Sequence, residues 1–275
     1  LGSRTRIMGV LNTTPDSFSD GGLFFDAKDA VAQATAMAEQ GADIIDIGGE
    51  STRPFSEKVS EEDEIRRVIP VIKALSGSLR IPISIDTTKA EVAEKAIGAG
   101  ATIINDVSAL RFDPGLAAVA VEFDAPLILM HMLGDPGIMQ ADPHYDDVVI
   151  DIRSFLADAV ERAVSLGVSR DKVVVDPGIG FGKTIGHNLT LIKHLSDFAN
   201  LGLPVLIGTS RKAFIRRTLA EENGNELAPQ SPEVATGTQA TVAAAILNGA
   251  HMVRVHDVAL TVPTAKLADA ILSAK

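Results

Sequence analysis

The chain has 275 residues, of which 46% are hydrophobic and 22% charged, a balance typical of a globular protein that needs no disulfide or structural metal. It contains no cysteine, which excludes thiol nucleophiles, thiolate metal sites and disulfides. The net charge of −11, the absence of tryptophan and the single tyrosine argue against nucleic acid or an anionic membrane as a partner. No signal peptide and no apolar run of about 18 residues is visible, so we expect a soluble cytoplasmic protein.

Short apolar runs rich in Val and Ile alternate with longer segments of helical periodicity. The runs cover residues 6–11, 43–47, 83–86, 102–107, 127–131, 173–176, 205–208 and 252–255. They are continuously apolar, which is typical of parallel strands covered on both faces. The helical segments include residues 26–40, 61–76, 89–99 and 145–166, and three of them are followed by glycines that suit left-handed caps, namely Gly41, Gly100 and Gly167.

Eight such βα units predict an α/β protein with a single-domain (β/α)8 TIM barrel over residues 1–275, because this fold takes about 250 residues. A doubly wound open sheet shows the same alternation and is the alternative, although it usually has about five to seven strands. Residues 221–232 are polar and rich in helix breakers, so we expect an excursion in the seventh helical region.

Polar residues stand at the ends of most predicted strands, where a barrel carries its active site. They are Asn12, Asp46, Asp86, Asn105, His131, Asp176, Ser210 with Arg211 and Lys212, Arg254 and His256. Because polar groups are costly to bury without partners, their gathering at one mouth predicts a ligand site. Asp86, Asn105 and Asp176 could face a flat heterocycle with N–H donors. The basic residues Arg53, Lys212, Arg254 and His256 suit a phosphate group, so we expect one acidic and one basic side.

Other patterns at these ends do not define a site by themselves. Residues 178–184 look like a phosphate-binding loop, but its first glycine would fall at Pro177, so a nucleotide site is not expected. Lys212 could be a Schiff-base lysine or a simple hydrogen-bond donor. No two histidines have the spacing of a dedicated zinc site, and we interpret four as surface or loop residues, namely His144, His187, His194 and His251. Asp46 and His131 receive no role.

Eight motifs in chain order together resemble the dihydropteroate synthase family over essentially the whole chain. They are NTTPDSFSDGG at 12–22, GGESTRP at 48–54, SIDT at 84–87, NDV at 105–107, LMHM at 129–132, DPGIGFGK at 176–183, SRK at 210–212 and RVHD at 254–257. The resemblance implies a TIM barrel, generally a homodimer, acting on small molecules. Members join 4-aminobenzoate to (7,8-dihydropterin-6-yl)methyl diphosphate and release diphosphate, with Mg2+ as cofactor.

The resemblance also implies roles for individual residues. The pterin ring would be bound by Asp86, Asn105, Asp176 and Lys212, with Met130 and Gly208 lining its slot and Arg254 against its face. The diphosphate would be bound by Asn12, Arg53, Arg254 and His256, and Asn12 would also bind Mg2+. The aminobenzoate pocket would be formed by Phe18, Thr52, Pro54, Phe181 and Ser210. The residues expected to act in catalysis are Asp86, Lys212, Asn12 and His256.

These residues suit a dissociative reaction, in which diphosphate leaves and the amine then attacks carbon without a covalent enzyme intermediate. The loops at 12–22 and 48–59 would close over the site. Ala213 and the pair Phe55-Ser56 depart from the family pattern, which puts aminobenzoate affinity and sulfonamide sensitivity in question. Two other functions stay open: a methyltetrahydrofolate-dependent methyltransferase on the same barrel, and a non-catalytic pterin-binding protein.

Overall fold

A computed structural model of the chain describes residues 2, 4–13, 27–51, 59–135, 137, 139–140, 142–221 and 224–274. The strands are β1 (Arg6–Asn12), β2 (Ile44–Gly48), β3 (Ile83–Asp86), β4 (Ile103–Asp106), β5 (Leu127–Met130), β6 (Val173–Asp176), β7 (Leu206–Ile207) and β8 (Met252–Val255). The α-helices are α1 (Ala27–Glu39), α2 (Glu61–Ser76), α3 (Ala90–Ala99), α4 (Gly115–Glu122), α5 (Val148–Ser165), α6 (Ile185–Lys193), α7 (Ala213–Thr218), α8 (Pro232–Leu247) and α9 (Val258–Ser273). Short 3-10 helices lie at η2 (Arg170–Lys172) and η3 (Leu195–Leu201).

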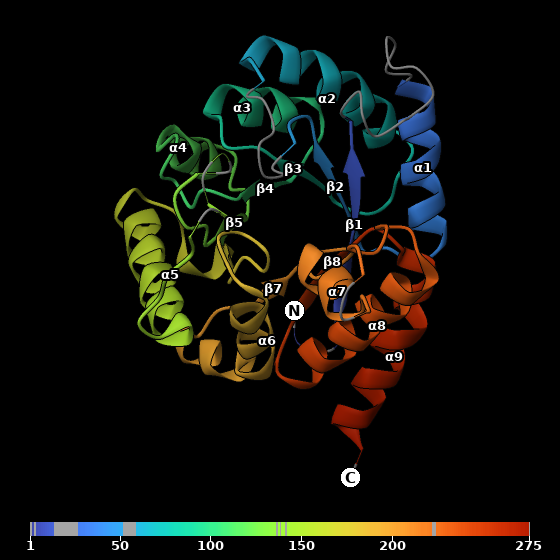
Figure 1. Cartoon of the computed structure of the whole chain (residues 1–275). Coiled ribbons are helices and arrows are strands. Elements are labelled where there is room, and N and C mark those ends of the chain that lie inside the picture. The colour runs from blue at the N-terminus through green and yellow to red at the C-terminus, as the bar shows by residue number, and fades with distance from the viewer. Residues whose placement is uncertain are drawn as a thin grey trace.

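The strands form one parallel sheet in the order β6-β5-β4-β3-β2-β1-β8-β7. The first strand pairs with both β2 and the last strand, β8, as in a closed barrel, whereas in the usual doubly wound order the first strand pairs with the second and the fourth. An isolated parallel bridge between Val175 and Val205 joins β6 to β7 and brings the two ends of the sheet together. The helices surround the strands in chain order (Figure 1). The predicted (β/α)8 TIM barrel is confirmed.

Some element bounds differ from the sequence prediction. The seventh strand is shorter than expected, because Val205 takes part only in the isolated bridge and Gly208 lies beyond the strand. Helix α5 begins at Val148 rather than at residue 145, since the Asp147 side chain accepts the N–H groups of the next turn and caps the helix there. Two helices, α7 and α8, occupy the seventh helical region, and the predicted excursion lies between them.

The direction of the strand side chains explains where the polar residues go. Six apolar residues, one from each of six strands, form a small cluster inside the barrel: Met8, Ile44, Ile128, Val174, Leu206 and Met252, with Ile103 packed against it. Side chains alternate along a strand, so the residue two positions further on lies on the same inner side. On seven strands that step leads to Val10, Asp46, Asn105, Met130, Asp176, Gly208 and Arg254. The polar ring therefore sits one layer above an apolar floor.

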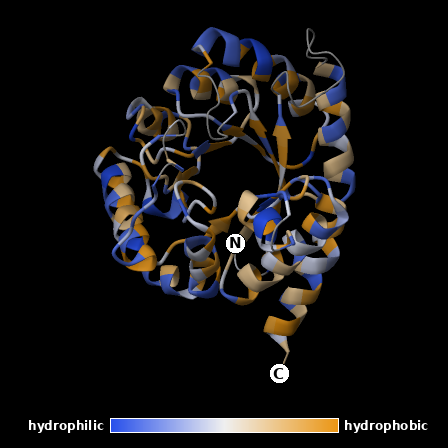
Figure 2. Ribbon diagram, in the orientation of Figure 1, coloured by the Kyte–Doolittle hydropathy of each residue, from blue (hydrophilic) through white to orange (hydrophobic). Residues whose placement is uncertain are grey.

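The remaining strand residues, such as Ile45, Ile85 and Val253, belong to a large core shared with the helices. The strands are drawn mainly in hydrophobic colours, whereas the surrounding helices mix both kinds (Figure 2). The predicted cap positions Gly41, Gly100 and Gly167 all have positive φ, and Gly100 ends α3 with φ 119°. Among the described residues, no helix combines the length and apolar character needed to span a bilayer.

Candidate functional site

A network of charged and amide groups joins the ends of β2, β3, β4 and β8. The Arg254 guanidinium donates through Nε to Asp46 Oδ2 at 2.6 Å and through Nη2 to Asp86 Oδ2 at 2.7 Å. Asn105 Nδ2 donates to the same Asp46 oxygen at 3.0 Å. Asp46 is completely buried, while 22% of the Arg254 side chain is exposed to the mouth. Four side chains predicted from separate strand ends are thus in direct contact.

The predicted division into an acidic and a basic side is wrong for Arg254. This residue lies on β8, and its side chain reaches past β1 to the carboxylates of β2 and β3. A buried carboxylate requires a counter-charge, and the guanidinium supplies two directed hydrogen bonds for this purpose. The charges at the mouth are therefore interleaved, with one guanidinium between two carboxylates.

Two polar atoms beside this network lack a hydrogen-bond partner among the described residues. Asp46 Oδ1 and Ser84 Oγ are buried and make no hydrogen bond within the described part of the chain. The two residues are aligned across β2 and β3, so the atoms belong to neighbouring strands. Leaving a buried polar atom unpaired costs about 1–3 kcal/mol, and a ligand with N–H donors would remove that cost.

The ionisation of the two predicted ring-binding carboxyls is strongly perturbed. Burial raises the pKa of Asp86, and the negative charge of Asp46 adds to this effect, whereas Arg254 opposes it. Burial raises the pKa of Asp176 to about 6, against the opposing effects of the Gly178 N–H and the charge of Lys212. Burial alone would lower the pKa of Arg254, but its carboxylate neighbours raise it, so the guanidinium stays charged. Such perturbed groups in one concave region are characteristic of functional sites.

The opposite wall of the mouth combines an acid, a cation and apolar side chains. One oxygen of Asp176 accepts the N–H of Gly178 at 2.7 Å. The Lys212 ammonium lies 4.1 Å from the centre of the Phe181 ring, within the range of a cation–π interaction. Phe181 packs with Met130 in a buried cluster, and Met130 is aligned with Asp176 across β5 and β6. The structure therefore brings all four predicted residues to one side.

Close backbone packing accounts for glycines in the segment after β6. Gly178 has φ 70°, and a Cβ there would lie 1.9 Å from the carbonyl oxygen of His131. A Cβ on Gly182 would lie 2.5 Å from Cβ of Leu133. These close approaches account for the glycines at both positions. The helix that follows, α6, is capped by the Thr184 side chain.

A buried lysine–histidine pair lies beneath this segment and was missed from the sequence. Lys183 is 4% exposed, and its Nζ lies 3.0 Å from His131 Nδ1 and donates to the Phe181 carbonyl at 2.9 Å. Burial and the neighbouring Lys183 lower the pKa of His131 to about 2, so the imidazole is neutral and can accept the hydrogen bond. His131 therefore helps to hold the backbone of Phe181. The only sequence signal was a histidine at a strand end.

A third contact group joins the ends of β7 and β8. The Ser210 hydroxyl is buried, accepts the backbone N–H of His256 at 3.2 Å and lies 3.0 Å from His256 Nδ1. A Cβ on Gly208 would lie 3.7 Å from Cβ of Arg254, so this glycine is next to the charged network. Ser210 and His256 are thus in direct contact, and Gly208 lies beside Arg254.

The remaining predicted residues divide into two sets. Asn12 ends β1 and is aligned with Gly48 of β2, at the same rim as the network. Four predicted residues lie outside the described residues: Phe18, Thr52, Arg53 and Pro54. In the described ranges, no three His, Asp or Glu side chains converge as metal ligands.

Comparison with known proteins gives a consistent result. Residues 8–256 match the family described as pterin binding enzyme. The chain is 48% identical over 270 residues to a dihydropteroate synthase of Synechocystis sp., covering 98% of this chain and 91% of the relative. A dihydropteroate synthase of Yersinia pestis, solved as a sulfonamide drug complex, superposes with a TM-score of 0.91 at 42% identity, covering 99% and 96% of the two chains. One from Xanthomonas albilineans, solved with 4-aminobenzoic acid, gives 0.90 at 43% identity, covering 99% and 94%.

Proposed function

The chain belongs to the dihydropteroate synthase family of pterin-binding enzymes, and we propose that the mouth of its barrel holds the pterin ring during that reaction. As a transferase of folate biosynthesis, the enzyme condenses (7,8-dihydropterin-6-yl)methyl diphosphate with 4-aminobenzoate. The products are 7,8-dihydropteroate and diphosphate. The proposed pterin site rests on the buried hydrogen-bond acceptors at the mouth of the barrel.

The pterin ring offers an amidine-like edge with several N–H groups, and the mouth offers acceptors that match it. Asp176 has one oxygen on the Gly178 N–H, so its other oxygen can accept from the ring. Asp46 Oδ1 and Ser84 Oγ lack protein partners in the described part of the chain. Lys212 lies over Phe181 at the same wall and can donate to a ring oxygen or nitrogen. These groups would orient the ring and exclude water from it.

The charges of the mouth support a dissociative reaction. When diphosphate departs, positive charge develops on the dihydropterin, and fixed carboxylates in a water-poor site stabilise such charge strongly. Asp86 and Asp46 are held in place by Arg254, which also keeps them from repelling each other. No general base is required to activate the attacking amine, because an arylamine is nucleophilic in its neutral form. Lys212 then acts as a hydrogen-bond donor, and the Schiff-base alternative is not needed.

We place the diphosphate near Asn12 and His256, with Arg254 reaching it from the ring side. The donor set fits Mg2+, since this cation keeps several waters and is usually bound by few protein oxygens together with substrate phosphates. Asn12 would supply an amide oxygen, and water and diphosphate oxygens would supply the other ligands. Bound Mg2+ would offset charge on the leaving diphosphate.

We place 4-aminobenzoate against Phe181 and Ser210, and the family resemblance adds Phe18, Thr52 and Pro54, which are outside the described residues. Phe181 is 8% exposed and is fixed by the Lys183 contact to its carbonyl, so it can present a rigid ring to the substrate. Ser210 is positioned by His256. The same residues would contact a sulfonamide, which resembles 4-aminobenzoate in shape.

A homodimer in the cytoplasm remains part of the proposal. The last two helices, α8 and α9, carry large apolar side chains that are at least 41% exposed, namely Leu247, Leu260, Leu267, Ile271 and Leu272. A second copy of the chain would cover such a surface. Sedimentation velocity of the purified protein tests this, with Leu267→Glu expected to shift the protein to monomer.

The experiment that tests the function measures diphosphate release from the dihydropterin diphosphate with Mg2+, with and without 4-aminobenzoate. We expect release that depends on 4-aminobenzoate and that yields dihydropteroate in equal amount. Pterin binding without turnover would favour the non-catalytic alternative. Methyl transfer from methyltetrahydrofolate, in place of condensation, would favour the methyltransferase.

A further inference from the structure

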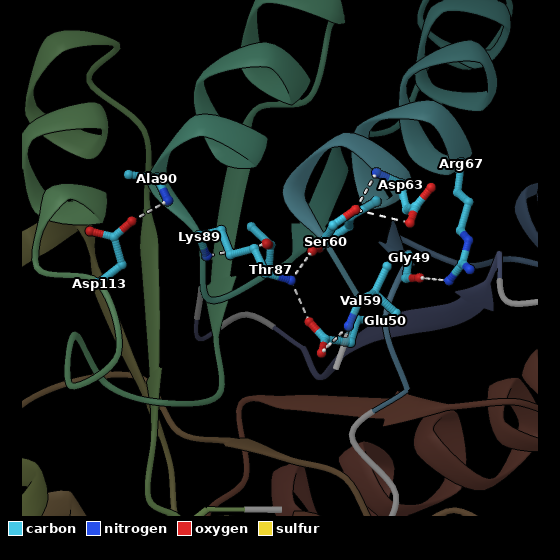
Figure 3. A network of polar contacts seen from close by, with 11 residues as sticks. Gly49, Glu50, Val59, Ser60, Asp63, Arg67, Thr87, Lys89, Ala90 and Asp113 are labelled. Carbon is cyan, nitrogen blue, oxygen red and sulfur yellow. Dashed lines mark hydrogen bonds and ion pairs between the residues drawn. The ribbon is translucent and has the colours of Figure 1, made fainter. Parts of the chain in front are cut away.

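Lys89 bridges two glutamates, Glu50 and Glu64, and Figure 3 shows Lys89 close to Glu50. Lys89 Nζ donates to Glu50 Oε2 and to Glu64 Oε2, each at 2.5 Å. The side chains of Lys89 and Glu50 are about one fifth exposed, at 19% and 22%, and that of Glu64 is 1% exposed. Burial lowers the pKa of Lys89, but the two glutamates raise it further, so the ammonium remains charged. None of these residues has a place in the function proposed above.

The second oxygen of Glu50 makes a contact of a different kind. Glu50 Oε1 accepts the backbone N–H of Val59 at 3.1 Å. Glu50 stands two residues after the end of β2, and Val59 comes directly before Ser60, the cap of α2. One carboxylate therefore connects the point where the chain leaves β2 with the point where it enters α2.

Lys89 fixes that carboxylate relative to the site. It is the N-cap residue of α3 and follows Asp86, at the end of β3, by three positions. The Gly49 carbonyl accepts a hydrogen bond from Arg67 of α2 at 2.9 Å. This is a second contact that fixes the backbone just after β2. A Cβ on Gly49 would lie 2.8 Å from Cγ of Glu64, so the glutamate packs directly on the backbone there. The exit from β2 is thus fixed by the ends of β3 and α2.

Packing alone does not explain this arrangement. Three charges in a largely buried position lose much of their hydration, and an apolar group of similar size would often hold a helix on a strand equally well. What an apolar group could not do is accept the Val59 N–H and an ammonium in two fixed directions. The geometry therefore favours a role in placing backbone.

We propose that Glu50 and Lys89 are positioning residues for the second substrate. They set the two points, at Glu50 and Val59, between which the chain carries Thr52, Arg53 and Pro54. This inference rests on the proposed function, in which Thr52 and Pro54 contact 4-aminobenzoate. It assigns the pair no contact with substrate, and it leaves the pterin ring to the residues of the barrel interior.

The test compares steady-state kinetics with pterin binding in a set of variants. Glu50→Ala removes both contacts, Lys89→Met keeps the side-chain length but removes the ammonium, and Lys89→Arg restores a charged donor. Glu91→Ala is the matched control, since Glu91 forms an exposed pair with Lys95 on α3. Product formation gives the Michaelis constant for the arylamine substrate, and calorimetry gives the dissociation constant for the plain hydroxymethyl pterin.

Losing a charge-assisted hydrogen bond predicts that the Michaelis constant for the arylamine rises about tenfold in Glu50→Ala and Lys89→Met, while pterin affinity stays unchanged within about twofold. Lys89→Arg should lie closer to the wild type, and Glu91→Ala should match it. An unchanged Michaelis constant, or equal losses for both ligands, would overturn the inference. If Glu50→Ala does not fold, Glu50→Gln keeps an acceptor for Val59 and should still raise the Michaelis constant. A wild-type protein that forms no dihydropteroate would instead refute the proposed function, and with it the inference.

Discussion

Replacing Asp176 with Asn tests two effects of its buried carboxylate: the carboxylate should lower the stability of the fold and raise the affinity for pterin. The side chain is 6% exposed, and burial raises its pKa from 3.8 to about 6. A carboxyl whose pKa is higher in the folded protein holds its proton more tightly there than in the unfolded chain. The free energy of unfolding is therefore highest below the unfolded pKa and falls as the pH rises through about 6. At pH 8 the loss amounts to about 3 kcal/mol. Neutral Asn, which can still accept the Gly178 N–H, should recover much of it.

Pterin binding should respond in the opposite direction. With its oxygen turned to Gly178, the Asn side chain presents an N–H2 group where the ring expects an acceptor. Losing this charge-assisted hydrogen bond costs about 1.5–3 kcal/mol, which corresponds to a pterin affinity about ten to 100 times weaker. In the wild type the affinity should also fall below pH 6, as the carboxyl takes up a proton. The variant should lack that step.

Both effects are measured with urea unfolding and calorimetric titration of the plain hydroxymethyl pterin, each at pH 5 and pH 8. We expect Asp176→Asn to be more stable than the wild type at pH 8 and to bind more weakly there, with both differences smaller at pH 5. A variant that is less stable at pH 8, or a ratio of affinities that does not change with pH, would refute this reasoning.

Three further substitutions test other parts of the site. Asp46→Asn leaves Arg254 with one buried carboxylate partner instead of two and should lower the free energy of unfolding by about 3 kcal/mol in urea; an unchanged midpoint would contradict the network. Gly178→Ala places a Cβ 1.9 Å from the His131 carbonyl oxygen and should destabilise the fold by more than about 3 kcal/mol, or prevent soluble expression. His256→Ala should weaken binding of the dihydropterin diphosphate about tenfold while leaving plain pterin unchanged, and equal losses would show that His256 does not act through the diphosphate.

The positions of the site residues could be predicted because strand geometry is regular. Residues at the carboxyl ends of barrel strands lie near the mouth. Side chains two positions apart lie on the same face of a strand, so Asp46 and Arg254 lie inside the barrel like Ile44 and Met252. The fold followed from the same alternation of apolar runs and helical segments. Asp46 had no role at that stage, since nothing in its neighbours along the chain shows that Arg254, on β8, would reach it.

The contacts that were missed join distant parts of the chain. Lys183 meets His131, 52 residues away, and Lys89 meets Glu64, 25 residues away. Such pairs depend on which helices and loops come together around the barrel, and a single sequence does not contain that information. The neighbouring motifs indicated that these residues lie near the site, but not which residues they contact. The start of β7 was also mistaken, because Val205 looks apolar enough for a longer strand yet is paired only by an isolated bridge to Val175, although its carbonyl accepts the Met252 N–H at 3.1 Å.

The Val175–Val205 bridge marks a junction with few backbone hydrogen bonds between β6 and β7, which we call the seam. Between β1 and β2 five residue pairs are aligned, whereas β6 and β7 are joined in the described part of the chain by the Val175–Val205 bridge, with the Val175 N–H donating to Pro204 at 3.0 Å. Asp176 lies on one side of the seam, and Lys212 and Arg254 lie on the other. A pterin that binds to both sides acts as a cross-link, so the amide hydrogens of β7 should exchange with solvent more slowly once the ring is bound. Pterin binding would then add contacts between β6 and β7, where the backbone supplies few hydrogen bonds.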